Sequence, residues 1–261
     1  MSPSLPPEIL DLIFDHLHDE PTTLRACCLV SQSWIPRTRI RLFDRVEFLL
    51  SESTIESWMR TFPDPSNSPA HYTRSLLLSD FKGITVALPW IQSFNHIVEL
   101  EVASWADNRH ISLTRLCGLS PTLKYLRISH ALAPLSEILE FICSFPLLED
   151  LALCFLTFKG NADIWDAPLT SPKFTGSLLL SSSDRKFIRK LLDLPGGLHF
   201  SKITVSSSIG DCDLVNELVS TCSNTLESFC IDFYARAFLM GFMADQYLIA
   251  PRRCARDATS A

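Results

Sequence analysis

A short run of acids and histidines near the start of the chain holds the residues best suited to metal chemistry. The run consists of Asp15, His16, His18, Asp19 and Glu20. Imidazole and carboxylate groups are common metal ligands. However, His16 and His18 are two positions apart on an expected helix, and residues at that spacing do not share a face. We therefore interpret the run as a solvated helix end and expect no metal site.

The cysteines do not follow a metal-binding pattern either. No Cys-x-x-Cys pair occurs, and Cys212, Cys222 and Cys230 are too far apart for a zinc knuckle. Cys27 and Cys28 are neighbours, which rarely have the geometry for a bond, so we expect them to pack in a core. Nine scattered thiols indicate a reduced, intracellular protein, without distinguishing cytoplasm from nucleus.

Local catalytic signatures are absent from the sequence. It has no glycine-rich phosphate loop, no Gly-x-Ser-x-Gly and no His-Glu-x-x-His. The formal net charge of −6 argues against a nucleic-acid surface, and no apolar run is long enough to span a membrane. We therefore expect no enzyme activity, no cofactor, no nucleic acid and no membrane, although a triad scattered over distant positions would escape such a search.

The first part of the chain predicts a small helical module at residues 1–45. Proline after Leu5 suits a first helical turn, because its missing N–H would have no partner there. A wide apolar stripe follows at helical spacing, at Ile9, Leu10, Ile13, Phe14 and Leu17. A second helical pattern at 24–30 and apolar residues at 40–43 complete three helices. The module has more apolar residues than so small a core can bury, so some should face the rest of the chain or a partner.

These residues and their spacing resemble an F-box over roughly residues 4–45. The resemblance rests on the Leu-Pro-Pro opening, the apolar stripe, Leu24, the run Leu29-Val30-Ser31 and Trp34. It implies that the module docks a Skp-type adaptor, and through it a cullin, in an SCF-type ubiquitin ligase. The residues implied to contact the adaptor are Leu5, Pro6, Ile9, Ile13, Leu17, Val30 and Trp34. The alternative is that the whole stripe packs inside the protein.

Residues 46–71 are expected to form a helical bridge and a loop. The segment from Ser51 to Phe62 has helical spacing, and Ser51 or Ser53 suits its N-terminal cap. The proline- and serine-rich run at 63–69 predicts the loop.

From residue 72 to 233 the sequence repeats two apolar residues separated by one. The pairs are Leu76/Leu78, Leu100/Val102, Leu126/Ile128, Leu151/Leu153, Leu178/Leu180, Ile203/Val205 and Phe229/Ile231. Their spacing of about 25 residues resembles leucine-rich repeats, in which parallel strands alternate with return segments. Helical stripes at 135–145, 187–192 and 214–222 fit such segments. We therefore expect an α/β fold, with a small N-terminal three-helix F-box followed by an irregular leucine-rich-repeat-like solenoid whose parallel sheet lines one face.

The repeats depart from the family at the turn after each strand. The usual asparagine or cysteine is replaced by Phe81, Trp105, Ala131, Leu156, Ser183, Ser208 and Tyr234. Individual turns are therefore expected to be irregular, and residues 159–172 predict a loop.

Alternate strand residues are expected to line one face of the sheet, where repeat proteins bind partners. The candidate target-binding residues are Glu99, Glu101, Tyr125, Arg127, Asp150 and Lys202. Ordinary solvated strand residues would give the same pattern. The basic run at Arg37, Arg39, Arg41 and Arg45 also has two interpretations. It would be a solvated face, or it would contact an acidic partner.

Residues 234–261 are expected to provide a capping helix and a disordered tail. Apolar residues at Phe238, Leu239, Phe242, Met243 and Tyr247 fall on one side of a helix at 235–250. Such a helix would cover the last repeat. The alternative is that the chain is a truncated form of a longer solenoid.

Together these features predict the substrate-recognition subunit of an SCF-type ubiquitin ligase. It would hold an unknown target protein near the ubiquitin-loading enzyme and do no chemistry itself. The alternatives are a protein-interaction scaffold without a ubiquitin-ligase role, and a hydrolase or transferase hidden in the C-terminal region.

Overall fold

The computed structural model describes residues 6–17, 19–49, 52–79, 84–103, 113–158, 171–181, 185–206 and 212–232. Within these ranges the chain is a mixed α/β protein with a parallel sheet, which confirms the predicted α/β class. Most of the loop expected at 159–172 and the whole segment 234–261, expected to provide a capping helix and a tail, lie outside the described residues.

The first module contains three short helices. They are α1 (Pro7–His16), α2 (Pro21–Val30) and α3 (Ile35–Leu42), with a 3₁₀ turn at Gln32–Trp34 between the last two. A proline stands in the first turn of each helix, where it removes only an N–H that the helix would leave unpaired. Leu10, Phe14 and Leu24 form a small core, and the ring of Trp34 meets Phe14 edge to face, 5.6 Å between centroids.

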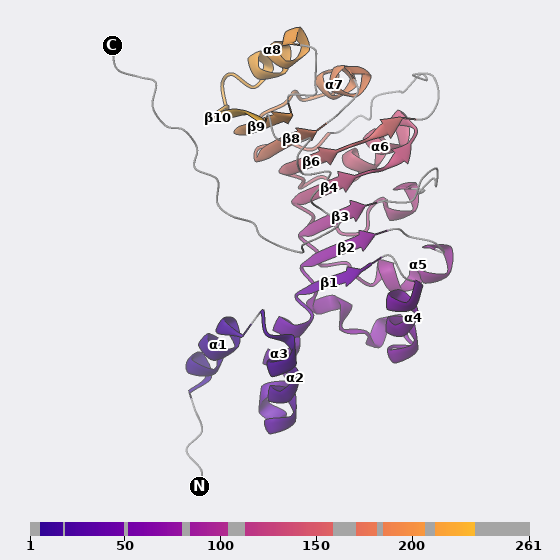
Figure 1. Cartoon of the computed structure of the whole chain (residues 1–261), viewed down its shortest axis with the longest axis vertical. Coiled ribbons are helices and arrows are strands. Elements are labelled where there is room, and N and C mark those ends of the chain that lie inside the picture. The colour runs from indigo at the N-terminus through magenta and orange to yellow at the C-terminus, as the bar shows by residue number, and fades with distance from the viewer. Residues whose placement is uncertain are drawn as a thin grey trace.

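An eight-stranded sheet forms the rest of the molecule (Figure 1). Its strands are β1 (Arg45–Phe48), β2 (Ser75–Ser79), β3 (Glu99–Ala103), β4 (Tyr125–Ser129), β6 (Asp150–Cys154), β8 (Ser177–Ser181), β9 (Lys202–Ser206) and β10 (Ser228–Asp232). They pair in parallel and in sequence order, and every predicted apolar pair lies in one of them. Two further short strands, β5 (Leu132–Ala133) and β7 (Thr157–Phe158), pair with each other.

The sheet begins one strand earlier than the repeat pattern indicates. Residues 45–48 were expected at the junction of the first module and the bridge, but they form a strand that pairs with β2 from Ser75 to Leu78. Val46 and Phe48 are buried in the main core at 7% and 3% exposure. The first module is therefore followed directly by the edge strand of the sheet.

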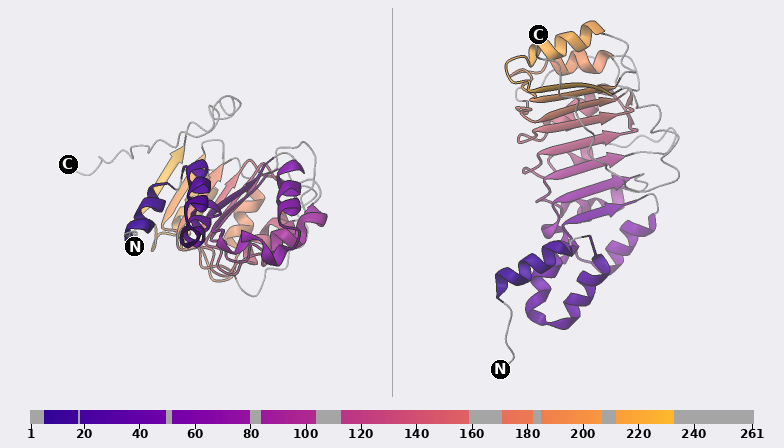
Figure 2. Two further views of the ribbon diagram at one scale, coloured as in Figure 1. Left: turned by 90° about the horizontal axis from the view of Figure 1, so that it is seen from below. Right: turned by 60° about the vertical axis from the view of Figure 1, so that its left-hand side comes forward.

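Helices and 3₁₀ turns connect the strands. They are α4 (Glu52–Thr61), η2 (Pro65–Asn67), η3 (Pro69–Tyr72), α5 (Ile84–Gln92), η4 (Leu113–Leu116), α6 (Leu135–Cys143), α7 (Arg185–Leu192) and α8 (Cys212–Thr221). Figures 1 and 2 show the connecting helices along one face of the sheet, and among the described residues no connecting helix lies on the other face. The helical predictions at 135–145, 187–192 and 214–222 are confirmed by α6, α7 and α8. One continuous hydrophobic core fills the space between the sheet and these segments.

Backbone atoms at the beginning of the strands set the register. In most pairs of neighbouring units one carbonyl accepts two successive N–H groups from the next unit. For example, Val98 O accepts from Lys124 N at 2.9 Å and from Tyr125 N at 3.0 Å. The acceptor residues are Asp44, Arg74, Val98, Lys124, Glu149, Gly176 and Ser201. The exception is the carbonyl of Glu149, which accepts a single backbone N–H, that of Gly176. We call this series the carbonyl ladder.

The turns after β4 and β6 lack the polar side chain that the resemblance to leucine-rich repeats predicts at this position. Ala131 and Leu156, which stand at that position, are buried at 2% and 6% exposure. The preceding residues, His130 and Phe155, adopt left-handed backbone angles with φ of 54° and 55°, and their rings stack 5.0 Å apart. Apolar packing and ring stacking therefore hold these two turns.

Candidate interaction surfaces

Helix α1 carries two apolar faces, and only one of them is buried. Leu10 and Phe14 are 9% and 1% exposed in the small core, whereas Ile9, Leu12 and Ile13 are 43%, 57% and 39% exposed. An aliphatic side chain gains about 1.5–3 kcal/mol from full burial, so a second apolar face left in water is a large uncovered surface for ten residues.

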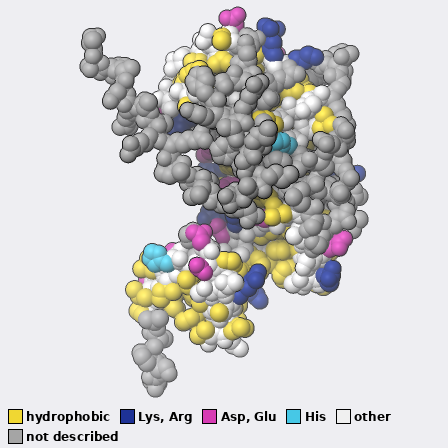
Figure 3. Space-filling view, viewed as in Figure 1, with side chains coloured by type: hydrophobic (Ala, Val, Ile, Leu, Met, Phe, Trp, Pro, Cys, Tyr) yellow, Lys and Arg dark blue, Asp and Glu magenta, His cyan; other side chains and the backbone are white. Residues whose placement is uncertain are grey.

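The end of α2 also carries exposed apolar side chains. Leu29 and Val30 are 89% and 67% exposed, although both belong to a helix whose Leu24 is fully buried. Figure 3 shows hydrophobic side chains gathered over this module. We call Ile9, Leu12, Ile13, Leu29 and Val30 the exposed apolar set.

The predicted adaptor-contacting residues fall into three groups. Pro6, Ile9, Ile13 and Val30 are exposed. Leu17 and Trp34 are partly buried, because they pack against the small core. Leu5 lies outside the described residues. Leu12 and Leu29 are also exposed but were not among the predicted contact residues, although Leu29 belongs to the run that carries the F-box resemblance.

Two ion pairs fix the orientation of α1 on α3. Arg37 contacts Asp11 at 2.8 Å, and Arg41 contacts Asp15 at 2.5 Å. Both pairs join residues four apart on one helix to residues four apart on the other, so each helix presents one matching charged stripe. The Arg37 guanidinium also donates to the carbonyl of Pro7 at 2.7 Å. We call these contacts the α1–α3 clasp; because it occupies one side of α1, Ile9, Leu12 and Ile13 are held facing away from the core.

The clasp also accounts for much of the basic run. Arg37 and Arg41 belong to the clasp, and Arg45 contacts Glu47 on its own strand at 2.8 Å. These charges are matched within the chain, so their presence does not require an acidic partner.

The register of the strands places two rows of side chains on the strand-lined face of the sheet. One row is Arg45, Ser75, Glu99, Tyr125, Asp150, Ser177, Lys202 and Ser228. The other is Glu47, Leu77, Glu101, Arg127, Ala152, Leu179, Thr204 and Cys230. All six predicted target-binding residues lie in these rows, within the sheet from β3 to β9.

Three of the six form a cluster at the centre of this face. The Nε of Arg127 lies 3.4 Å from Oε1 of Glu101, a charge contact longer than a good hydrogen bond. Burial raises the pKa of the adjacent Tyr125, and Arg127 opposes that rise. Burial lowers the pKa of Arg127, but Glu101, Cys154 and Tyr125 together outweigh burial, so the pKa of Arg127 is raised. At neutral pH the cluster is therefore one internal ion pair beside a neutral phenol, and its net charge is zero.

The other three candidates behave differently from one another. Asp150 is structural, since its Oδ1 accepts hydrogen bonds from the backbone N and the Oγ of Ser177 at 2.5 and 2.6 Å. Glu99 and Lys202 are exposed, on β3 and β9. The face therefore presents an exposed acid and an exposed base on opposite sides of a neutral centre.

Buried thiols near the face are unreactive at neutral pH. Burial raises the pKa of Cys154, which lies beside the central cluster, and that of Cys143 on α6 rises to about 11. The thiolate is the reactive form, so these side chains act as small apolar groups.

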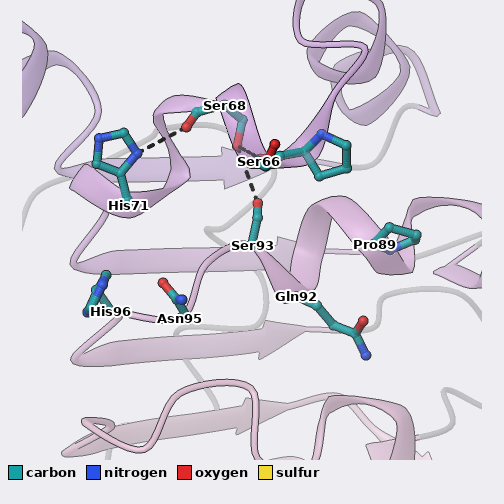
Figure 4. Close-up of a pocket in the computed structure, with 9 residues that line it drawn as sticks. Ser66, Ser68, His71, Pro89, Gln92, Ser93, Asn95 and His96 are labelled. Carbon is teal, nitrogen blue, oxygen red and sulfur yellow. Dashed lines mark hydrogen bonds between the residues drawn. The ribbon is translucent and has the colours of Figure 1, made fainter.

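A pocket of about 400 Å³ beside η3 and α5 shows no catalytic arrangement (Figure 4). Its hydroxyls bond locally, since Ser68 donates to Pro65 O at 2.7 Å and Ser93 to Trp90 O at 2.5 Å. His71 Nδ1 lies 3.1 Å from Ser68 O. No acid or cysteine lines this pocket, and the hydroxyls of Ser68 and Ser93 donate to backbone carbonyls rather than to a histidine.

Two searches of the described ranges gave negative results. No group of three or more His, Cys, Asp or Glu side chains there is placed to hold a metal ion. Among the same residues, no helix has the length and apolar character to cross a membrane.

Comparisons with known proteins found neither a matching family model nor a matching curated protein. A functional assignment therefore depends on the residues and geometry described above.

Proposed function

We propose that this protein is an F-box adaptor, the substrate-recognition subunit of an SCF-type ubiquitin ligase. The N-terminal module would bind a Skp-type adaptor, and the strand-lined face of a leucine-rich-repeat-like solenoid would bind a target protein. The observation that carries the proposal is the exposed apolar set on a module that already possesses a packed core. Together with the resemblance of residues 4–45 to an F-box, it favours a helical protein partner.

The energetics favour a partner at the module more than a further intramolecular contact. The described sheet has its own continuous core, and the small core of α1 and α2 is a separate cluster. The exposed apolar set belongs to neither. Covering several of its side chains would bury the kind of apolar centre that dominates binding free energy in protein interfaces.

The sheet supports the second half of the proposal. Parallel strands in sequence order, each followed by a return segment, give a long face that a partner can approach without competition from helices. With an adaptor at one end and a target on this face, the protein would raise the effective concentration of the target at the ligase. The chemistry would belong to the bound enzymes.

The test is copurification of the full chain with a Skp-type adaptor. The variant Ile9→Ser/Ile13→Ser/Val30→Ser should bind at least about 100-fold more weakly, because truncating buried anchors costs about 1–2 kcal/mol or more each. The matched control is Leu147→Ser, since Leu147 is 53% exposed but lies after α6, far along the chain. Wild-type-like binding by the triple variant, or no binding by the wild type, would contradict the proposal.

Ubiquitin transfer separates the ligase role from a scaffold role. A complex reconstituted with adaptor, cullin and ubiquitin-loading enzyme should ubiquitinate a bound target, and the triple variant should not. Adaptor binding without any transfer, to the target or to the protein itself, would favour the scaffold.

A further inference from the structure

Helix α7 carries basic side chains along its outer side. Its inner side is apolar, since Phe187, Ile188 and Leu191 are each 0% exposed in the main core. Between these positions stand four bases at helical spacing, so they share the opposite side of the helix. They are Arg185, Lys186, Arg189 and Lys190, of which the first three are exposed and the last is partly buried. We call them the α7 basic stripe; Figure 3 shows Lys and Arg side chains at the end of the molecule where α7 lies.

The stripe distinguishes α7 from the other described helices that connect the strands. Helix α5 has no charged residue, α4 has two acids and one base, and α6 and α8 have two acids each. In sequence, Asp184 and Asp193 flank the stripe, so residues 184–193 hold four bases and two acids. The whole chain, in contrast, has a formal net charge of −6. The stripe is therefore a local concentration of positive charge on an acidic protein.

The positions of these bases oppose the stability of the helix. Arg185 and Lys186 stand in the first turn of α7, where the positive end of the helix dipole disfavours cations. Arg185 and Arg189 are like charges four residues apart, as are Lys186 and Lys190, and such pairs destabilise a helix. The stability of α7 therefore does not account for the stripe.

Neighbouring acids leave much of the stripe unneutralised. Lys190 contacts Asp193 at 3.7 Å, a long contact for an ion pair. Helix α8 packs beside α7 and exposes Asp213 and Glu217, but among the described residues neither acid forms an ion pair with the stripe. Arg189 has no ion pair within the same part of the chain. The positive charge of the stripe is therefore available to another molecule.

We propose that the α7 basic stripe binds an acidic polypeptide segment of a partner protein. Eight helical residues span about 12 Å, a length that the carboxylates of a short segment can match. A membrane or a nucleic acid fits less well, because a larger anionic surface would also cover the exposed acids of α8. The apolar side of α7 is already buried, so the helix has no free apolar face to place in a lipid interface.

The stripe lies on the helical side of the sheet, away from the strand-lined face (Figure 2). A segment bound there would leave that face and the exposed apolar set open. The proposal is therefore independent of any adaptor or ligase.

Fluorescence anisotropy tests the site with the full chain and a short fluorescein-labelled peptide of alternating glutamate and alanine. Arg185→Gln/Lys186→Gln/Arg189→Gln should bind this peptide at least about tenfold more weakly than the wild type at low ionic strength, because three charge contacts are lost. The matched control is Arg25→Gln/Arg39→Gln/Arg60→Gln, which removes three charges from exposed positions outside α7 and should bind within about twofold of the wild type. Equal losses in both variants, or no binding by the wild type, would overturn the proposal.

A single charge reversal separates lost binding from lost folding. Arg189→Glu leaves the first turn of α7 unchanged and should weaken peptide binding about tenfold without lowering the unfolding temperature, whereas Arg60→Glu on α4 should not weaken it. Vesicles containing phosphatidylserine and a single-stranded DNA serve as alternative ligands. If either binds the wild type more tightly than the peptide does, and loses that binding in Arg189→Glu, the stripe is a membrane or nucleic-acid site and the proposal is overturned.

Discussion

At the scale of single residues, Asp150 and Gly176 form the tightest contact on the strand-lined face. Asp150 accepts two hydrogen bonds from Ser177, and Gly176 immediately precedes that serine. A Cβ built on Gly176 would collide with the carboxylate of Asp150. The glycine therefore lets the carboxylate reach the backbone of the next strand.

Gly176→Ala should lower the free energy of unfolding by about 1–3 kcal/mol, because the carboxylate must move and its bonds to Ser177 weaken. Urea unfolding measures the change. The control is the same substitution in an Asp150→Ala background, where the carboxylate is gone and the added methyl group should cost much less. An equal cost in both backgrounds would show that the collision does not matter.

At the scale of elements, the α1–α3 clasp decides which side of α1 is exposed. Each of its two ion pairs joins partly exposed side chains. Exposed pairs contribute only about 0.2–1 kcal/mol each and are screened by salt. The clasp therefore orients the helix more than it stabilises it.

Asp11→Asn/Asp15→Asn should destabilise the protein by about 0.5–2 kcal/mol at low ionic strength, and the difference should shrink in about 1 M salt. Chemical unfolding at two salt concentrations measures this. Glu56→Gln on α4 removes one exposed charge outside the clasp and should change stability by less than about 0.5 kcal/mol. A loss that is independent of salt would mean that the clasp acts through packing.

The limits of sequence reasoning are clearest at this scale. The stripe Ile9, Leu10, Ile13, Phe14 and Leu17 predicts a helix, but it is wide enough to serve two faces. Leu10 and Phe14 face inward because α3 packs on that side of α1. The position of α3 depends on contacts between residues that are far apart in the sequence, and helical periodicity does not encode these contacts. Which half of the stripe stays exposed therefore required the structure.

The strands, in contrast, could be predicted from the sequence. Their pattern of alternate apolar residues recurs so often that each copy supports the others. Strand β1 has the same pattern, with Phe43 three places before the pair Val46/Phe48, but it was missed because its pair lies 30 residues before the next one instead of about 25. Helix α5 was missed because an almost continuous apolar run has no clear period. Of the target-binding candidates, Asp150 could not be recognised as structural, since its partner Ser177 belongs to the next strand of the sheet.

At the scale of the whole molecule, the described chain has two separate hydrophobic cores. One comprises Leu10, Phe14 and Leu24, and the other runs along the sheet from Val46 on β1 to Cys222 after α8, without Phe229 and Ile231 of β10. The ring of Phe43 joins the two parts by edge-to-face contacts with Trp58 and Phe62. The two cores share no residue, so we expect the module to unfold without the sheet.

Leu24→Ala should remove about 2–5 kcal/mol from the small core, which is more than a module of this size is expected to tolerate. Limited proteolysis should then cut within residues 7–42 while a fragment beginning near β1 survives. Leu126→Ala, in the middle of the sheet, is the contrasting variant and should expose the strands instead. Simultaneous digestion of both parts in Leu24→Ala would indicate a single cooperative unit.

The carbonyl ladder has a consequence for how such a chain can lengthen. Its acceptor residues include acids, bases, a glycine and a valine, because only their backbone atoms take part. A copied unit of about 25 residues therefore brings its own acceptor and its own donors, and it fits between existing units with no change in their side chains. Gene duplication can therefore extend this sheet one unit at a time.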